Sequence, residues 1–183
     1  FGRSSLTVVI PVLSSMGFQV VPLPTAVLST HSQFKNYHFI DLSDHFQSIS
    51  KHWKELNLSF DAIYSGFLGS ERQIDMMIEF IEQFRKKDTV VMVDPVLGDN
   101  GKLYSPFNEL MVEEMKKLVK NAHIITPNIT EVGLLLDNDP SLIRNTEQTI
   151  EAIKTLSAMG PEIVVVTSVP DENDGKTSVI AYN

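Results

Sequence analysis

The sequence contains no cysteine. Disulfide bonds, thiolate nucleophiles and zinc or iron–sulfur sites held by cysteine are therefore excluded. No apolar run reaches the roughly 18 residues that a membrane-spanning helix needs. The first residues also lack the successive basic, apolar and cleavage zones of a secretory signal peptide. We therefore expect a soluble cytoplasmic protein.

Positive charge is also scarce, because 15 Lys and Arg stand against 23 Asp and Glu, which gives a formal net charge of −8. Binding to nucleic acid or to an anionic membrane depends on a basic patch, and no stretch of this chain supplies one. An acidic chain can still bind a phosphorylated ligand if a metal ion or helix N-termini screen the repulsion. With 43% hydrophobic residues over 183 positions, the chain can form one globular domain or a large piece of one.

Three common ligand-binding motifs are missing from the sequence. There is no G-x-x-x-x-G-K-[ST] phosphate loop, no G-x-G-x-x-G dinucleotide fingerprint and no G-x-S-x-G nucleophile elbow. If the ligand is a nucleotide, its phosphates must therefore be held in another way.

Helical periodicity alternates along the chain with short apolar runs. The clearest helix covers residues 70–88, where apolar residues recur at the i, i+3, i+4, i+7 spacing of one buried face. These residues are Ile74, Met77, Ile78 and Ile81. Ser70 is the expected N-cap, and the basic residues 85–87 fall in the expected last turn, where the helix dipole favours positive charge.

The apolar runs predict strands. Residues 89–96, 122–128 and 161–168 are nearly continuous apolar stretches, which are typical of strands buried on both faces of a parallel sheet. Further strands are expected at residues 18–30, 37–43, 60–68 and 176–183, and further helices at residues 4–17, 42–56, 105–120, 130–136 and 145–160. The polar segment 170–176 indicates a hairpin or an exposed loop. Repeated strand–helix units predict a three-layer α/β/α sandwich with a mostly parallel central sheet.

Oxygen-bearing side chains follow the predicted strands at the ends where ligands bind in open parallel sheets. Asp94 and Asp99 follow one strand, Thr126 and Glu131 follow the next, and Thr167 ends a third. Hard oxygen ligands of this kind suit Mg²⁺ that is held partly through water, together with a polyphosphate.

Each of these residues also has a purely structural explanation. Asn128 and Glu131 have the N-x-x-E spacing of a helix capping box, which needs no ligand. Asp94 precedes a proline, as in many turns, and Asp99 opens a D-N-G sequence that is typical of a tight turn. The Thr167 hydroxyl can bond the local backbone. An acid at the end of a buried strand is harder to dismiss, because its desolvation demands a partner.

The runs VVMVDPVLGDNGKLY (90–104), HIITPNITE (123–131) and VVVTS (164–168) resemble the ribokinase superfamily and, within it, the pyridoxal kinases. Residues 20–34, VVPLPTAVLSTHSQF, resemble the substrate segment of that family. The resemblance extends in order over essentially the whole chain and implies a ribokinase-like fold. It also implies ATP-dependent phosphorylation of the 5′-hydroxymethyl group of pyridoxal, pyridoxine or pyridoxamine, with Mg²⁺, in a homodimer.

The resemblance assigns roles to individual residues. Asp94 would lie near the ATP phosphates and the metal, while Asp99 and Glu131 would organise Mg²⁺ through water. The residues that would line the nucleotide are Thr126, Asn128 and Thr167. The residues that would face the pyridine ring are His31, Ser32, Gln33 and Phe67. Two of these depart from the family pattern, since Ser32 stands where many relatives have threonine and Phe67 where some have tyrosine.

The catalytic base of the family is an aspartate in a Gly-(Thr/Ala)-Gly-Asp motif, and no such motif occurs in these residues. The chain opens at a helix start, with no strand before it, and ends on a strand. We therefore expect residues 1–183 to be a single ribokinase-like domain that lacks the first strand and the C-terminal part carrying the base. No residue of this chain is predicted to be catalytic.

Three other functions fit parts of the sequence. A hydroxymethylpyrimidine kinase of thiamin synthesis would share the architecture and the reaction, but residues 97–101 and 31–33 favour the pyridoxal kinases. A phosphoacceptor receiver domain would need an acidic pair after its first strand and a lysine after its last, and neither is found. A kinase-like binding protein without a base is the remaining alternative.

Overall fold

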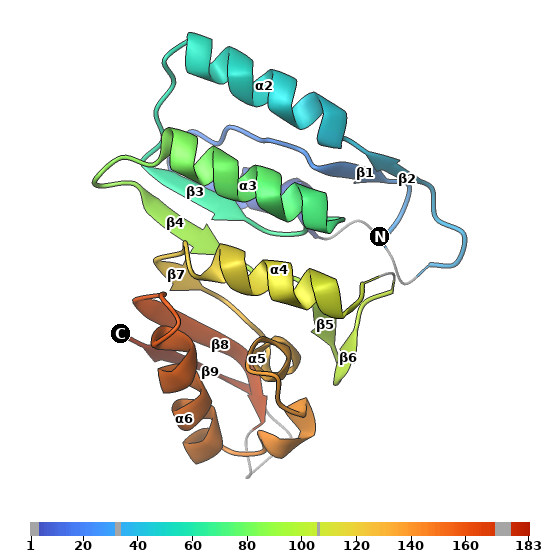
Figure 1. The fold of residues 1–183 in the computed structure, drawn as a ribbon, viewed down its shortest axis with the longest axis vertical. Coiled ribbons are helices and arrows are strands. Elements are labelled where there is room, and N and C mark those ends of the chain that lie inside the picture. Colours follow the sequence, from blue (N-terminus) through green and yellow to red (C-terminus); the bar gives the residue numbers. More distant parts are fainter. Residues whose placement is uncertain (1–3, 32–33, 106, 171–176) are drawn as a thin grey trace. The chain divides into compact units, whose positions relative to one another are not determined.

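The computed structural model describes residues 4–31, 34–105, 107–170 and 177–183. By its internal contacts the chain divides into two compact units. The first unit is Phe1–Leu58 with Phe67–Gly69, and the second is Ser59–Gly66 with Ser70–Asn183. Figure 1 labels the elements of both units.

The first unit contains helix α1 (Leu6–Ser15), strands β1 (Ala26–Leu28) and β2 (Phe39–Asp41), and helix α2 (Ser43–Glu55). Strands β1 and β2 pair antiparallel, with Val27 opposite Ile40. The strand predicted from residue 18 onward begins only at Ala26. Pro22 and Pro24 explain the difference, because proline cannot donate a hydrogen bond to a sheet ladder.

A five-stranded sheet forms the centre of the second unit, in the order β3-β4-β7-β8-β9. Its strands are β3 (Ala62–Ser65), β4 (Val90–Val93), β7 (Ile124–Ile125), β8 (Ile163–Pro170) and β9 (Thr177–Tyr182). The first four strands run parallel and β9 pairs antiparallel with β8. The predicted mixed α/β class with a mostly parallel sheet is confirmed.

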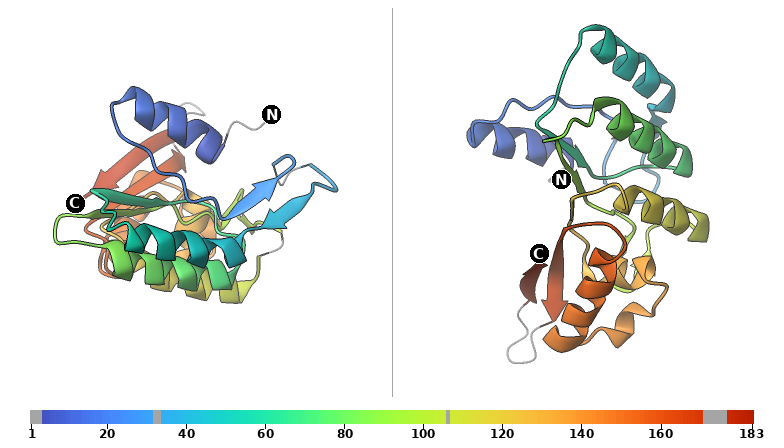
Figure 2. Two further views of the ribbon diagram at one scale, coloured as in Figure 1. Left: turned by 90° about the horizontal axis from the view of Figure 1, so that it is seen from above. Right: turned by 60° about the vertical axis from the view of Figure 1, so that its left-hand side comes forward.

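Helices connect these strands, as the alternating pattern predicted. They are α3 (Glu71–Phe84), α4 (Glu109–Val119), α5 (Ile129–Leu135) and α6 (Thr146–Ser157), with the 3-10 turn η1 (Pro140–Leu142) between the last two. Helices α3 and α4 lie side by side in Figures 1 and 2. None of the helices in the described part of the chain is long and apolar enough to cross a membrane.

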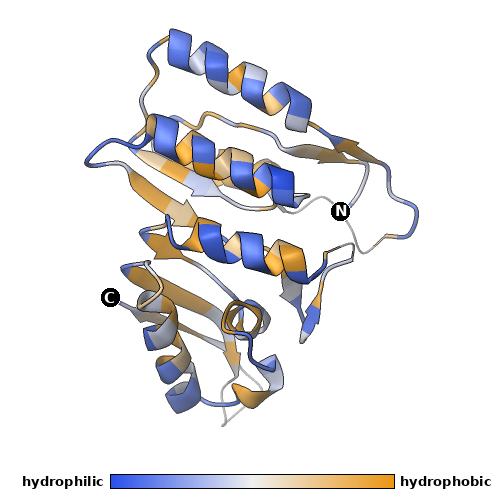
Figure 3. Ribbon diagram, in the orientation of Figure 1, coloured by the Kyte–Doolittle hydropathy of each residue, from blue (hydrophilic) through white to orange (hydrophobic). Residues whose placement is uncertain are grey.

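The helix α3 shows how sequence periodicity becomes packing. Ser70 caps it by accepting a hydrogen bond from the Gln73 N–H. Ile74 and Ile81 from the predicted apolar face are almost completely buried. Figure 3 shows this alternation of hydrophobic and hydrophilic faces along the helices. The basic residues 85–87 lie beyond the last turn instead of within it, because the helix ends at Phe84 and the backbone of Arg85 is already extended.

One face of the sheet holds the core of the second unit. Val91 and Val93 of β4, Ile125 of β7 and Val164 of β8 are fully buried on it. The neighbouring residue Val90 is 41% exposed, and Met92 is only half-buried. Within the second unit as described, the apolar run of β4 therefore packs closely on one side, and its burial on both faces stays a prediction. Of the polar segment 170–176, residues 171–176 lie outside the described residues.

Replacing Gly133 in α5 by alanine tests the packing of the second unit. A Cβ at this position would lie 2.7–2.9 Å from atoms of Pro140, including its backbone nitrogen and Cα. Alanine favours a helix by about 1 kcal/mol relative to glycine. We nevertheless expect Gly133→Ala to lower the free energy of unfolding by roughly 1–3 kcal/mol, as overpacking does. The measurement is chemical denaturation. Gly66→Ala, where nothing lies within 4 Å of the added Cβ, is the control, and equal stability of both variants would contradict the prediction.

Candidate functional site

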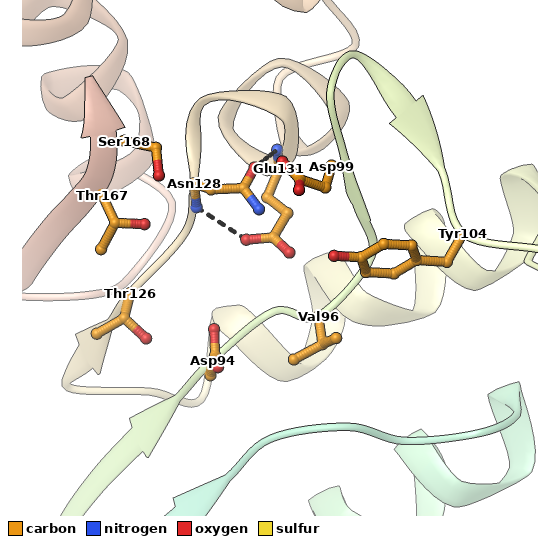
Figure 4. A pocket seen from close by; sticks show the side chains of 9 residues that line it. All are labelled: Asp94, Val96, Asp99, Tyr104, Thr126, Asn128, Glu131, Thr167 and Ser168. Carbon is orange, nitrogen blue, oxygen red and sulfur yellow. Dashed lines mark hydrogen bonds between the residues drawn. The ribbon is translucent and has the colours of Figure 1, made fainter. Parts of the chain in front are cut away.

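A pocket of about 290 Å³ lies in the second unit where β4 and β7 end, beside Thr167 and Ser168 of β8 (Figure 4). Its lining is mostly oxygen-bearing side chains. The lining residues are Asp94, Val96, Asp99, Tyr104, Thr126, Asn128, Glu131, Thr167 and Ser168. The structure thus brings together every residue that the sequence assigned to the nucleotide or the metal. The roles themselves stay predictions.

The parallel sheet explains this convergence. Asp94 directly follows β4, and the N–H of Thr126, just after β7, donates to the carbonyl of Val93 at 3.2 Å. The N–H of Thr167 in β8 donates to the carbonyl of Pro127 at 2.9 Å. Because neighbouring strand ends are tied to one another in register, their side chains come to one edge of the sheet.

Asp94 belongs to a row of polar side chains across three strands. Tyr64 pairs with Met92, which pairs in turn with Ile124, so that Tyr64, Asp94 and Thr126 lie on the same face of the sheet. Burial raises the pKa of Asp94 above its ordinary value, and hydrogen bonds from the hydroxyls of Thr126 and Tyr64 offset part of the rise.

Glu131 is 3% exposed and bonded on both carboxylate oxygens. Its Oε2 accepts a hydrogen bond from the Asn128 N–H at 2.8 Å, and Asn128 Oδ1 accepts one from the Glu131 N–H at 3.0 Å. The capping box that the spacing predicted is therefore confirmed. The second oxygen, Oε1, accepts the N–H of Leu97 at 3.2 Å.

The electrostatics of Glu131 reflect its burial. Burial raises the pKa of this carboxyl to about 8, and the nearby charge of Asp94 adds to the rise. Hydrogen bonds from the backbone of Asn128, Leu97 and Gly98 work in the opposite direction, because they favour the ionised form.

A short hairpin forms one wall of the pocket. Strands β5 (Gly98–Asp99) and β6 (Lys102–Leu103) pair antiparallel. Between them Asn100 and Gly101 have positive φ values of 52° and 74°, as in a type I′ turn, so the tight turn indicated by D-N-G is confirmed. A side chain on Gly98 would collide with the carbonyl of Lys102. The carboxylate of Asp99 accepts hydrogen bonds from the Asn100 N–H at 2.8 Å and from Asn100 Nδ2 at 3.1 Å.

Val96, Tyr104 and Ser168 line the pocket although the sequence did not assign them to it. Tyr104 follows β6, and burial together with the charges of Asp99, Glu131 and Asp94 raises its pKa. In Figure 4 its hydroxyl points toward Glu131 and Asp99. The D-N-G turn could have indicated a hairpin that carries Tyr104 back to the strand ends. Ser168 was detectable only as the neighbour of Thr167.

Ser168 lies at an irregularity in the sheet. The pairing of β8 with β9 shifts between Val166 and Val169, and Ser168 has a φ of 58°. Such bulges turn side chains away from regular pairing and are frequent beside active sites. The bulge leaves Thr167 and Ser168 at the pocket instead of in the ladder.

The residues predicted to face a pyridine ring belong to the first unit. His31 packs edge-on against Phe34, with ring centroids 4.6 Å apart. Phe67 accepts a hydrogen bond on its carbonyl from Thr25 Oγ1 at 3.1 Å. Ser32 and Gln33 lie outside the described residues. The structure therefore does not test these four assignments.

Among the described residues no group of three His, Cys, Asp or Glu side chains is arranged to hold a metal ion. Asp94, Asp99 and Glu131 all line the pocket, but they do not form a compact set of direct ligands. Carboxylate and hydroxyl oxygens nevertheless suit Mg²⁺, which keeps several waters and binds through one or two carboxylates and substrate phosphates. The donor chemistry of the pocket fits that mode of binding.

The chain matches the family of phosphomethylpyrimidine kinases over residues 13–182. It is 29% identical over 180 residues to a pyridoxal kinase of Leifsonia xyli, which covers 93% of this chain and 62% of the relative. Other curated pyridoxal kinases, including the human one, match over about half of their own length.

The solved structures of similar fold include the following two crystal structures. One is a Bacteroides thetaiotaomicron protein named as a phosphomethylpyrimidine kinase and solved in a form with pyridoxal, with a TM-score of 0.95 and 52% identity over 100% of this chain and 64% of that one. The other is a pyridoxal kinase of Lactobacillus plantarum, with a TM-score of 0.82 and 29% identity over 97% of this chain and 66% of that one. The mixed α/β fold therefore matches that of a pyridoxal kinase.

The protonation of Glu131 predicts how stability depends on pH. The folded-state pKa of about 8 lies above the ordinary value of 4.5. The folded protein therefore holds a proton that the unfolded chain releases between these values, and stability falls as pH rises. The slope from this one group is at most about 1.4 kcal/mol per pH unit.

Denaturation between pH 5 and 8, without divalent cations, measures this slope. In Glu131→Gln the contribution should disappear and the free energy of unfolding should depend less on pH. The exposed Glu109, substituted by Gln in the same way, is the control and should keep the wild-type profile. Identical profiles for wild type and Glu131→Gln would contradict the prediction.

Proposed function

Since the chain belongs to the phosphomethylpyrimidine kinase family, we propose that the protein is an ATP-dependent kinase of pyridoxal, pyridoxine or pyridoxamine. The phosphoryl group would be transferred to the 5′-hydroxymethyl group of the vitamer. The pocket that lies after β4 and β7 and beside Thr167 of β8 carries this proposal, because carboxylates and hydroxyls from these three segments face one cavity. The relatives named as pyridoxal kinases and the similar structure solved with pyridoxal support the choice of substrate.

The charges of the pocket explain why a divalent cation is part of the proposal. Asp94 and Asp99 would stand beside the negative phosphates of ATP, and Glu131 would add to this negative charge once it is ionised. Negative groups that stand next to one another in a partly buried site repel one another strongly. Mg²⁺, when bound, supplies the charge that neutralises both sets of oxygens. We propose that Asp94 and Asp99 hold it, partly through water, and that Glu131 contributes from its buried position.

The hydroxyl groups have a different task. Thr126 and Thr167 present hydroxyls to the pocket, together with the side chain of Asn128. These groups can donate hydrogen bonds to phosphate oxygens and orient the nucleotide. Direct in-line transfer to the vitamer hydroxyl needs little more than such positioning and electrostatic stabilisation.

The proposal assigns no general base to these residues, because the Gly-x-Gly-Asp motif of the family is not among them. On the substrate side we propose His31, Ser32, Gln33 and Phe67 as contacts of the pyridine ring. A homodimer and a cytoplasmic location also stay predictions.

A hydroxymethylpyrimidine is the second candidate substrate, because the family that the chain matches is named for phosphomethylpyrimidine kinases. The relatives named as pyridoxal kinases favour pyridoxal over it. The pocket described above does not separate the two substrates, because its residues concern the phosphates. A kinase-like protein that binds these ligands without transferring the phosphoryl group is the third candidate.

Steady-state kinetics of the full-length protein with ATP and Mg²⁺ separates these candidates. We expect kcat/KM for pyridoxal to exceed that for hydroxymethylpyrimidine by about tenfold or more, a ratio that a few differing ring contacts can supply. A preference for the pyrimidine would support the second candidate. Binding of pyridoxal without turnover would support the third.

Asp94→Asn tests the nucleotide side of the proposal. The substitution keeps the shape of the side chain and removes its charge, so Mg²⁺-ATP should be used about tenfold or more less efficiently. Kinetics at varied Mg²⁺-ATP measures the effect. Asp88→Asn, an exposed aspartate on the loop before β4, is the matched control. Wild-type kinetics in Asp94→Asn would remove this residue from the site.

A further inference from the structure

The first turn of α5 is bonded to the β5–β6 hairpin. Glu131 Oε1 accepts the N–H of Leu97, the residue before β5, at 3.2 Å. Asn128 Nδ2 donates to the carbonyl of Gly98 at 2.9 Å. These two bonds fix the start of the hairpin, and both come from residues that line the pocket themselves.

A third bond fixes the tip of the hairpin. The hydroxyl of Thr130 accepts the N–H of Gly101 at 2.9 Å. Thr130 is 5% exposed and does not line the pocket. Gly101 is the second residue of the tight turn, with its backbone in the left-handed region. Neither the capping box of α5 nor the proposed ligands account for this contact.

The hairpin needs such support because it is very short. Each of its strands has two residues, and an isolated two-stranded hairpin is at best marginally stable in water. Asp99 lies between the two places where α5 holds the hairpin, Gly98 at one side and Gly101 at the other. Any shift of the turn would therefore carry the carboxylate of Asp99 with it.

We propose that Thr130 is a positioning residue, whose hydroxyl holds the tip of the β5–β6 hairpin so that Asp99 faces the pocket. The expected effect on Mg²⁺-ATP binding rests on the proposed kinase function, because it requires that Asp99 helps to bind Mg²⁺-ATP. The hydrogen bond and its effect on the hairpin do not depend on the identity of the substrate.

The first experiment replaces the hydroxyl without changing the shape of the side chain. In Thr130→Val, KM for Mg²⁺-ATP should rise by about tenfold, which is typical when a group that orients a ligand residue is lost. KM for pyridoxal should stay within twofold of wild type. Thr130→Ser keeps the hydroxyl, so its KM for Mg²⁺-ATP should stay close to that of wild type. Equal changes in both KM values, or no rescue by serine, would overturn the proposal.

A double-mutant comparison shows whether Thr130 acts through Asp99. In an Asp99→Asn background, Thr130→Val should have little further effect on KM for Mg²⁺-ATP, because the group that it positions has lost its charge. If the KM increases of the two single variants multiply in the double variant, Thr130 does not act through Asp99 and the proposal fails.

A matched control is available in α6. Thr149 is fully buried, and its hydroxyl donates to the carbonyl of Asn145 at 2.8 Å. Thr149→Val therefore removes a comparable buried hydroxyl, but from a helix that contributes no residue to the pocket. The Thr149→Val variant should be less stable than wild type, while its KM values for Mg²⁺-ATP and for pyridoxal should equal those of wild type. A rise in KM for Mg²⁺-ATP in this variant would mean that lost stability alone explains the result.

Amide hydrogen exchange gives a readout that needs no turnover. The N–H of Gly101 should exchange about tenfold faster in Thr130→Val than in wild type, since it loses its acceptor. Thr149→Val should leave that amide unchanged. Unchanged exchange at Gly101 in Thr130→Val would overturn the proposal even for an active kinase. If wild type does not phosphorylate pyridoxal but Gly101 responds as expected, the proposed function fails and the role of Thr130 stands.

Discussion

One buried carboxylate, that of Glu131, connects the parts of the second unit that surround the pocket. It completes the N-terminal cap of α5 through Asn128, and it accepts the backbone N–H of Leu97 in the segment after β4. Removing such a group from water is costly unless its oxygens are bonded, and here each oxygen has a backbone donor. The same bonds therefore stabilise the fold and shape the pocket. A structural and a functional explanation of Glu131 do not exclude each other.

The remainder of the pocket depends on the parallel sheet. Parallel strands present their carboxyl ends at one edge, so short polar sequences after β4 and β7 and in the last part of β8 meet without being close in the chain. Asp94 and Thr126 directly follow two adjacent strands and line the pocket together, while Thr167 comes from the next strand. The hairpin β5–β6 adds a wall that the strands alone would not supply. Because the three strands and the hairpin each supply part of the pocket, each segment contributes only a few residues to it.

Strand periodicity and the strand-end rule were sufficient to predict the fold class and to place Asp94, Thr126 and Thr167 near one another. They were not sufficient for Tyr104, because a hairpin of two-residue strands has too few residues to show a period. A run of β-branched residues also does not reveal which face of β4 packs more closely within the second unit. The basic residues after α3 were misplaced for a related reason, because helix ends are set by local backbone geometry.

The bulge in β8 has a consequence for how the last two strands align. Strand β9 pairs regularly with β8 on either side of Val166 and Val169, but the spacing differs across the irregularity. A slide of β9 by a single residue would break the match on both sides at once and would turn each of its side chains to the opposite face. The extra residue in β8 therefore fixes the register in which β9 pairs with it. Deleting one residue between Val166 and Val169 would therefore remove more than the hydroxyl group of Thr167 or Ser168, because β9 would also lose its unique alignment with β8.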